Sequence, residues 1–166
     1  MKKLTVRRSH RFRIECYDAE GRLKWVEELD NIVVNEALDD MLSVYYKGTA
    51  APSAFHVGLT NANPSFSATD TMSSHAGWTE NTSYSETSRP ACNFGSVSNQ
   101  SVSNSGSPAV FTINANTTVG GAFLTTNATK GGTAGKLIGG VAFSTNRTLA
   151  ANDTLQVTVT ASMSSS

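Results

Sequence analysis

The part of the chain from residue 48 onward is dominated by small polar residues. It contains 19 Ser, 19 Thr, 11 Asn and 12 Gly, which together fill 61 of its 119 positions. Thr is β-branched and fits strands, whereas Ser, Asn and Gly compete with helical hydrogen bonding and favour turns. This composition predicts an all-β body made of short strands and many turns.

The length of the chain, 166 residues, is that of one globular domain or of one domain with an appendage. A domain of this size buries roughly 70% of the surface of its unfolded chain, so a folded core is expected. We predict a basic arm and β-hairpin over residues 1–30, a β body over residues 31–163, and a loose tail over residues 164–166.

Several short segments alternate apolar and polar side chains, as half-buried strands do. Residues 11–17 and 23–29 flank turn chemistry at residues 18–21 and predict a hairpin. Residue 70 or 71 caps one expected helical turn that runs to residue 76. Further strands are expected near residues 55–59, 109–114, 121–126, 136–144 and 154–161. This spacing favours an antiparallel sandwich or a jelly roll.

One helix interrupts this pattern, at about residues 35–47. Asn35 is its expected N-cap and Gly48 its expected end. Its apolar residues are spaced by one, three or four, as on the buried face of a helix, and they are Ala37, Leu38, Met41, Leu42, Tyr45 and Tyr46. We therefore expect this face to pack against a sheet.

Charge is concentrated at the start of the chain. Residues 1–47 hold 9 of the 13 basic and 9 of the 13 acidic side chains. Six basic residues precede the first acidic residue, Glu15, and predict a cationic arm that either binds an anionic partner or is simply solvated: Lys2, Lys3, Arg7, Arg8, Arg11 and Arg13. Nucleic acid is disfavoured, because no aromatic residue interleaves with residues 1–11 and the whole chain is neutral. We expect deletion of residues 1–13 to leave the fold intact.

The sequence carries no recognisable catalytic motif, so we predict no catalytic, cofactor or metal residues. The Gly-rich stretch 130–137 has the wrong glycine spacing for a phosphate loop. The three histidines lack metal-ligand spacing, and no G-x-S-x-G elbow is present. Cys16 and Cys92 predict two reduced thiols in a protein made in a cytoplasm. No apolar run is long enough for a membrane span or a signal peptide.

The stretch 70–91 stands out, because bulky and charged residues interrupt small polar sequence there. His75, Trp78, Tyr84 and Arg89 are residue types that concentrate binding energy at protein interfaces. Alternatively, Trp78 and Tyr84 fill the core of the sheet while Arg89 pairs with Glu80 or Glu86. Both interpretations are open at this point.

These residues also carry a resemblance to a known family. The chain resembles small structural proteins of tailed bacteriophages over most of residues 31–161. The most specific parts are 70–80, 84–86 and 89–91, and the other matching segments are 31–39, 55–59, 109–114, 121–127 and 153–159. The resemblance implies a component of the virion and carries over no catalytic residues.

Composition and resemblance together lead to one hypothesis with alternatives. The first choice is a capsid decoration, or cement, protein that sits on the virion surface, binds the major capsid protein and forms a homotrimer. The first alternative is a neck, tail or fibre-associated component. The second is a carbohydrate-binding module that uses exposed Trp and Asn side chains.

Overall fold

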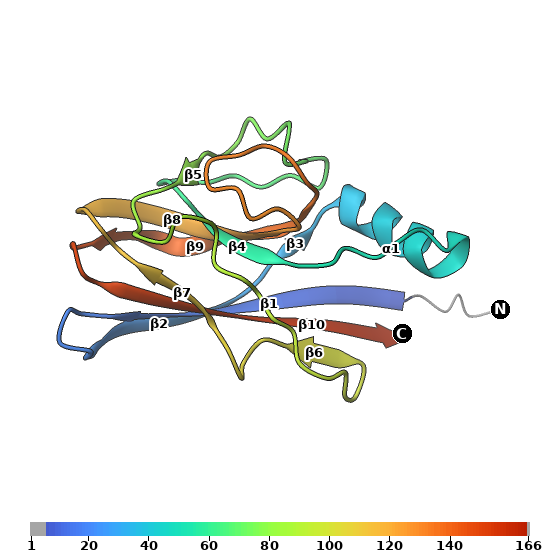
Figure 1. Cartoon of the computed structure of the whole chain (residues 1–166), viewed down its shortest axis with the longest axis horizontal. Helices are drawn as coiled ribbons and strands as arrows, with labels where there is room; N and C mark the ends of the chain where they lie inside the picture. The colour runs from blue at the N-terminus through green and yellow to red at the C-terminus, as the bar shows by residue number, and fades with distance from the viewer. Residues whose placement is uncertain (1–5, 166) are drawn as a thin grey trace.

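The computed structural model describes residues 6–165. Within them it contains two antiparallel five-stranded sheets and a single short helix, which confirms the all-β prediction. Figure 1 shows the two sheets as layers, one above the other. Buried apolar side chains of both sheets form one core cluster, as in a β-sandwich.

The first sheet is built around the two ends of the chain. β1 (Val6–Tyr17) lies between β2 (Leu23–Asp30) and β10 (Thr154–Ser165). Two short strands, β6 (Ser101–Ser103) and β7 (Ala109–Thr112), pair with different parts of β10. The hairpin predicted at residues 11–29 is therefore present.

The central position of β1 corrects three of our expectations. Residues 6–13 are not an arm but part of a strand that is bonded on both sides from Arg11 onward. Within the predicted unit 1–30, the described residues 6–30 are consequently part of the first sheet rather than a separate unit. Residues 164 and 165 are not a tail, because they end β10 and pair with Arg7 and Val6.

The second sheet has the order β3-β9-β8-β4-β5. β3 spans Ile32–Val33, β9 Leu137–Leu149, β8 Thr117–Thr125, β4 His56–Thr60 and β5 Glu80–Asn81. β5 is only two residues long. β9 and β8 extend beyond their predicted limits.

The core between the sheets follows the predicted alternation. Leu155, Val157 and Val159 of β10 are fully buried, as are Phe12 and its alternate neighbours in β1. The same alternation continues from Phe12 to His10, which is also fully buried. The inward face of β1 therefore includes an ionisable side chain.

The outer face of the second sheet is covered as well. Every residue from 119 to 125 in β8 is buried, as expected for a strand covered on both faces. The covering layer includes the long connection between β4 and β5, whose Phe66 ring lies over Gly140 and whose Pro64 lies over Gly121. In this layer residues 70–76 form a turn closed by a bridge between Thr71 and Ser74, so the expected helical turn is wrong.

The helix α1 (Asn35–Lys47) has nearly the predicted bounds but a different cap. Val34, not Asn35, is the N-cap, and no side chain caps the first turn. Gly48 ends the helix at φ +69°, a left-handed conformation that favours glycine. Within residues 6–165, no helix has the length and apolar character needed to cross a membrane.

The apolar face of α1 does not pack as expected. Only Ala37 and Asp40 of the helix are buried. Figure 1 shows α1 at the end of the molecule where β1 begins and β10 finishes. The expected buried face is instead largely open to solvent, with exposed fractions of 39% for Leu38, 56% for Leu42, 82% for Tyr45 and 74% for Tyr46.

Candidate functional site

A buried ion pair lies at the centre of the stretch 70–91. The Arg89 guanidinium donates to both carboxylate oxygens of Glu80, with Nε–Oε1 at 2.9 Å and Nη2–Oε2 at 2.7 Å. The Arg89 side chain is fully buried and the Glu80 side chain is 9% exposed. The bidentate geometry and the low exposure make this a strong charge-assisted contact.

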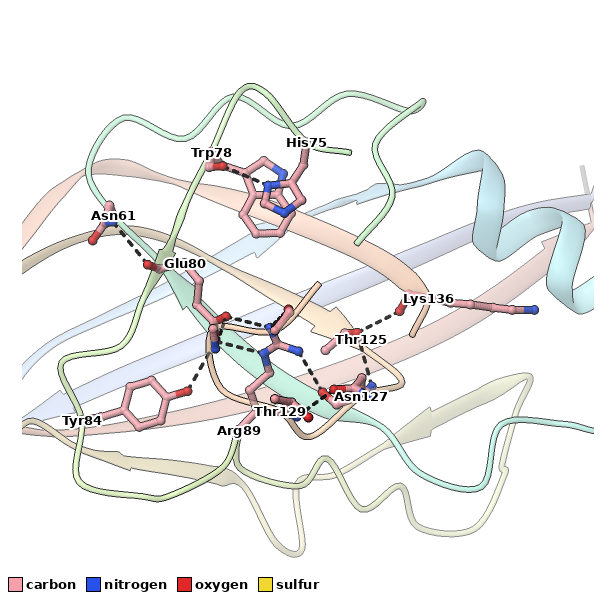
Figure 2. A network of polar contacts seen from close by, with 12 residues as sticks. Asn61, His75, Trp78, Glu80, Tyr84, Arg89, Thr125, Asn127, Thr129 and Lys136 are labelled. Atoms are coloured by element: carbon pink, nitrogen blue, oxygen red, sulfur yellow. Dashed lines mark hydrogen bonds and ion pairs between the residues drawn. The ribbon is translucent and has the colours of Figure 1, made fainter. Parts of the chain in front are cut away.

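This pair attaches the loop between β8 and β9 to the second sheet, as Figure 2 shows. Arg89 also donates to the carbonyl oxygens of Asn127 (3.0 Å) and Gly132 (2.6 Å), and Glu80 Oε2 accepts from the backbone N–H of Gly131 (2.9 Å). The Arg89 guanidinium carbon lies 5.2 Å from the centre of the Phe123 ring. The donors and acceptors of the pair are thus engaged within the chain.

Trp78 and His75 form the second half of the cluster. Their rings stack with centroids 3.7 Å apart, and Trp78 also contacts Phe123. The Trp78 indole N–H donates to a carboxylate oxygen of buried Asp70 at 3.0 Å. Figure 2 shows Trp78 and His75 side by side above the second sheet.

The cluster is structural, so the alternative in which these side chains anchor an interface is corrected. Trp78 is 5% exposed, Tyr84 is fully buried and Arg89 is 1% exposed, so another protein cannot reach them. Arg89 pairs with Glu80 rather than Glu86. His75 is half-buried and is engaged with the Trp78 carbonyl.

Two of the four described basic residues at the start of the chain are paired with carboxylates. Arg11 pairs with Asp30 of β2, and Arg13 pairs with Glu15 of its own strand and with Glu28 of β2. These ion pairs balance the charge of the hairpin locally. Lys2 and Lys3 lie outside the described residues, and Arg7 is exposed on β1.

Arg8 differs from Arg11 and Arg13, because it has no carboxylate partner within residues 6–165, and it differs from the exposed Arg7 because it is half-buried. The Arg8 guanidinium is half-buried, contacts the Met41 sulfur, and lies 2.8 Å from His10 Nε2. Burial lowers the pKa of Arg8 to about 10. Burial, together with the charge of Arg8, lowers the pKa of His10 to about 3, so His10 is neutral at physiological pH.

Beside Arg8 lies a groove of about 1010 Å³. One wall is the open face of α1, and the other is formed by the ends of β1, β3 and β10, including Arg8, Val33 and Met163. Sequence reasoning missed this groove. The stripe of apolar residues was visible, but its spacing is the same whether a helix covers its own core or faces another molecule.

The remaining reactive groups offer little chemistry. Cys16 and Cys92 are free and buried, and burial raises the pKa of their thiols to about 11 and about 12. Thiols with such pKa values are poor nucleophiles at neutral pH. The described part of the chain contains no group of three or more His, Cys, Asp or Glu side chains arranged for a metal ion.

A scan against protein-family models finds no match to the chain, and a search of curated proteins finds none either. The functional conclusion therefore depends on the geometry and on the sequence resemblance.

Proposed function

We propose that this protein is a structural component of a tailed-bacteriophage virion that decorates the capsid and stabilises it by binding the major capsid protein. The observation that carries the proposal is the open apolar end of the sandwich, formed by α1 and the groove beside it. Contiguous exposed apolar surface of this kind marks a contact with another protein, whether a second copy or a capsid subunit, and so supports a protein that works within an assembly.

Two other features support a structural role. The most distinctive side chains of the stretch 70–91 hold loops in place. Their hydrogen-bonding groups are engaged within the fold. On the outer face of the first sheet, Arg11 and Arg13 are paired with carboxylates, so a protein that contacts this face would meet balanced charge there. The resemblance to phage structural proteins suggests that the partner of this surface belongs to a virion.

The mechanism would be mass action. A protein that binds the assembled shell but not its separated subunits stabilises the shell by its binding free energy. Copies placed across neighbouring capsid subunits would thus oppose rupture of the shell. A homotrimer fits this role, because closed symmetric assemblies match the local symmetry axes of a shell.

The carbohydrate-binding alternative is not retained. It relied on exposed Trp and Asn side chains. Exposed asparagines are present, but Trp78 is 5% exposed and Trp25 is half-buried with the Arg147 guanidinium 4.9 Å from its ring centre, so no open tryptophan is available for a sugar ring. The neck, tail or fibre alternative is kept as an outcome of the test.

The test is to locate the protein in purified particles of a phage that encodes it, by cryo-electron microscopy of complete and depleted particles. We expect density on the capsid surface, and depleted particles should release their genome at a lower temperature than complete ones. Adding the purified protein back should restore the release temperature. Density on the tail or neck alone, or equal release temperatures, would contradict the capsid proposal.

A further inference from the structure

The open face of α1 has two properties that together restrict what covers it. At 100° per residue, its apolar arc from Met41 through Tyr45, Leu38 and Leu42 to Tyr46 spans about 140° of the helix. A seam between two helices uses a narrower stripe, whereas an arc of this width is typical of a helix that faces a core. The arc therefore suits contact with more than one neighbouring helix.

The flanks of this arc carry opposite charges that lack partners. Asp39 lies beyond Tyr46 on one flank, is exposed, and has no ion-pair or hydrogen-bond partner for its side chain within residues 6–165. Arg8 lies against Met41 on the other flank and has no carboxylate partner in the same part of the chain. Asp39 and Met41 differ by two residues, so the two charges lie within about 3 Å of each other along the helix axis.

The positions of the two charges distinguish antiparallel from parallel packing of α1 helices from two copies. When two helices pack antiparallel about a two-fold axis, the same flank of each helix meets its counterpart, so Asp39 would face Asp39 of the other copy. When parallel helices pack about a rotation axis, opposite flanks meet. Asp39 of one copy then reaches Arg8 of the next, and a half-buried charge gains the partner that such charges usually have.

The apolar area of the arc sets the strength of such an assembly. The exposed parts of Leu38, Leu42, Tyr45, Tyr46 and Met163 amount to about 600 Å² per copy, at roughly 200 Å² for each large side chain. Three copies would bury about 1,800 Å² among them, or about 600 Å² between each pair of neighbours, which is the size of a weak interface rather than of a permanent one.

We propose that α1 is the self-association element of this protein: three copies pack their α1 helices in parallel around a three-fold axis, and Asp39 of each copy pairs with Arg8 of the next. This inference deepens the proposed function and rests on it for the use of three-fold symmetry. It assigns the apolar end of the sandwich to contacts between copies and leaves the sheet surfaces for the shell.

Sedimentation equilibrium of the purified full chain tests the assembly. We expect a trimer for the wild type and at least ten-fold weaker association for Leu42→Asp, which places a charge at the centre of the apolar arc. Asp39→Arg should weaken association similarly, and the double variant Asp39→Arg with Arg8→Glu should restore it. Val110→Asp, at a 40% exposed residue of β7, is the matched control and should remain trimeric.

Cysteine cross-linking tests the arrangement without altering Arg8. Met163 is 48% exposed, lines the groove and lies opposite Arg8 on β10, so its side chain is on the same face of the sheet as that of Arg8. Under oxidation, a mixture of Asp39→Cys and Met163→Cys proteins should yield mixed disulfide-linked species, whereas Asp39→Cys alone should yield none. The native cysteines are buried and do not compete.

Three results would overturn the inference: a wild type that is monomeric or dimeric at 100 µM, a Leu42→Asp variant that stays trimeric, or Asp39→Cys that cross-links to itself. Because these measurements use purified protein without particles, they are independent of the virion proposal. A trimer that is absent from particles would reject the virion proposal alone.

Discussion

Replacing Arg89 with Met tests whether the buried Arg89–Glu80 pair holds the second sheet and its loops together. Methionine fills part of the same volume but leaves the Glu80 carboxylate, 9% exposed, without its cation, and leaves the carbonyl groups of Asn127 and Gly132 without their donor. Removing one partner of a buried ion pair typically costs about 3–5 kcal/mol. We therefore expect a loss of about 4 kcal/mol in the free energy of unfolding at pH 7.

Urea denaturation followed by tryptophan fluorescence measures this loss, because Trp78 is buried against Phe123. With an m-value of about 2 kcal/mol/M, the midpoint should fall by about 2 M. The loss should shrink when Glu80 is also replaced by Gln, because no buried charge then remains. The matched control is Arg22→Met in an exposed ion pair, which should cost less than about 1 kcal/mol. A loss below 1 kcal/mol for Arg89→Met would refute the reasoning.

Three further predictions concern the core. The structure reverses the expectation that deletion of residues 1–13 leaves the fold intact: this deletion removes buried Phe12 and eight of the twelve residues of β1, so it should abolish cooperative thermal unfolding monitored by circular dichroism. An unchanged melt would contradict the position of β1. Because the pKa of His10 in the folded state, about 3, lies below its unfolded value of 6.5, the unfolded state binds the proton first, so stability should fall by about 1.4 kcal/mol per unit as pH drops below 6.5. His10→Gln should remove that slope between pH 6.5 and 5, measured by urea titration, and a slope that persists would exclude His10 as its source. Gly58→Ala should cost about 1–3 kcal/mol in thermal unfolding, since its Cβ would lie 2.1 Å from the Phe123 ring, whereas alanine at exposed Gly106 should cost far less.

The strands could be predicted because the two-residue alternation of apolar and polar side chains depends only on neighbouring positions in the sequence. Alternation in β10 places Leu155, Val157 and Val159 on one face regardless of what lies opposite, and the structure buries all three. In β1 the alternation predicts a strand only from residue 11, because the basic residues before it favour a solvated arm. His10 continues the buried face, yet a histidine at that position carries no hydrophobic signal.

The stretch 70–91 was recognised as unusual, but its role was not decided by the sequence. The residue types that anchor interfaces also anchor loops, and only the distance between Arg89 and Glu80 separates the two roles. The partners of Arg89 at Asn127 and Gly132 lie about 40 residues away, in a loop that looks merely flexible in the sequence.

The helix shows why an amphipathic pattern is an incomplete prediction. The spacing of Leu38, Leu42 and Tyr45 reveals an apolar face, but it carries no information about which molecule covers that face. A helix of 13 residues is marginally stable by itself in water, and its stability comes mainly from packing. In this chain the packing that the sheets supply buries only Ala37 and Asp40 of the helix. The rest of the stabilisation of α1 is therefore expected to come from outside the subunit, so the helix should gain protection against amide hydrogen exchange when the protein associates.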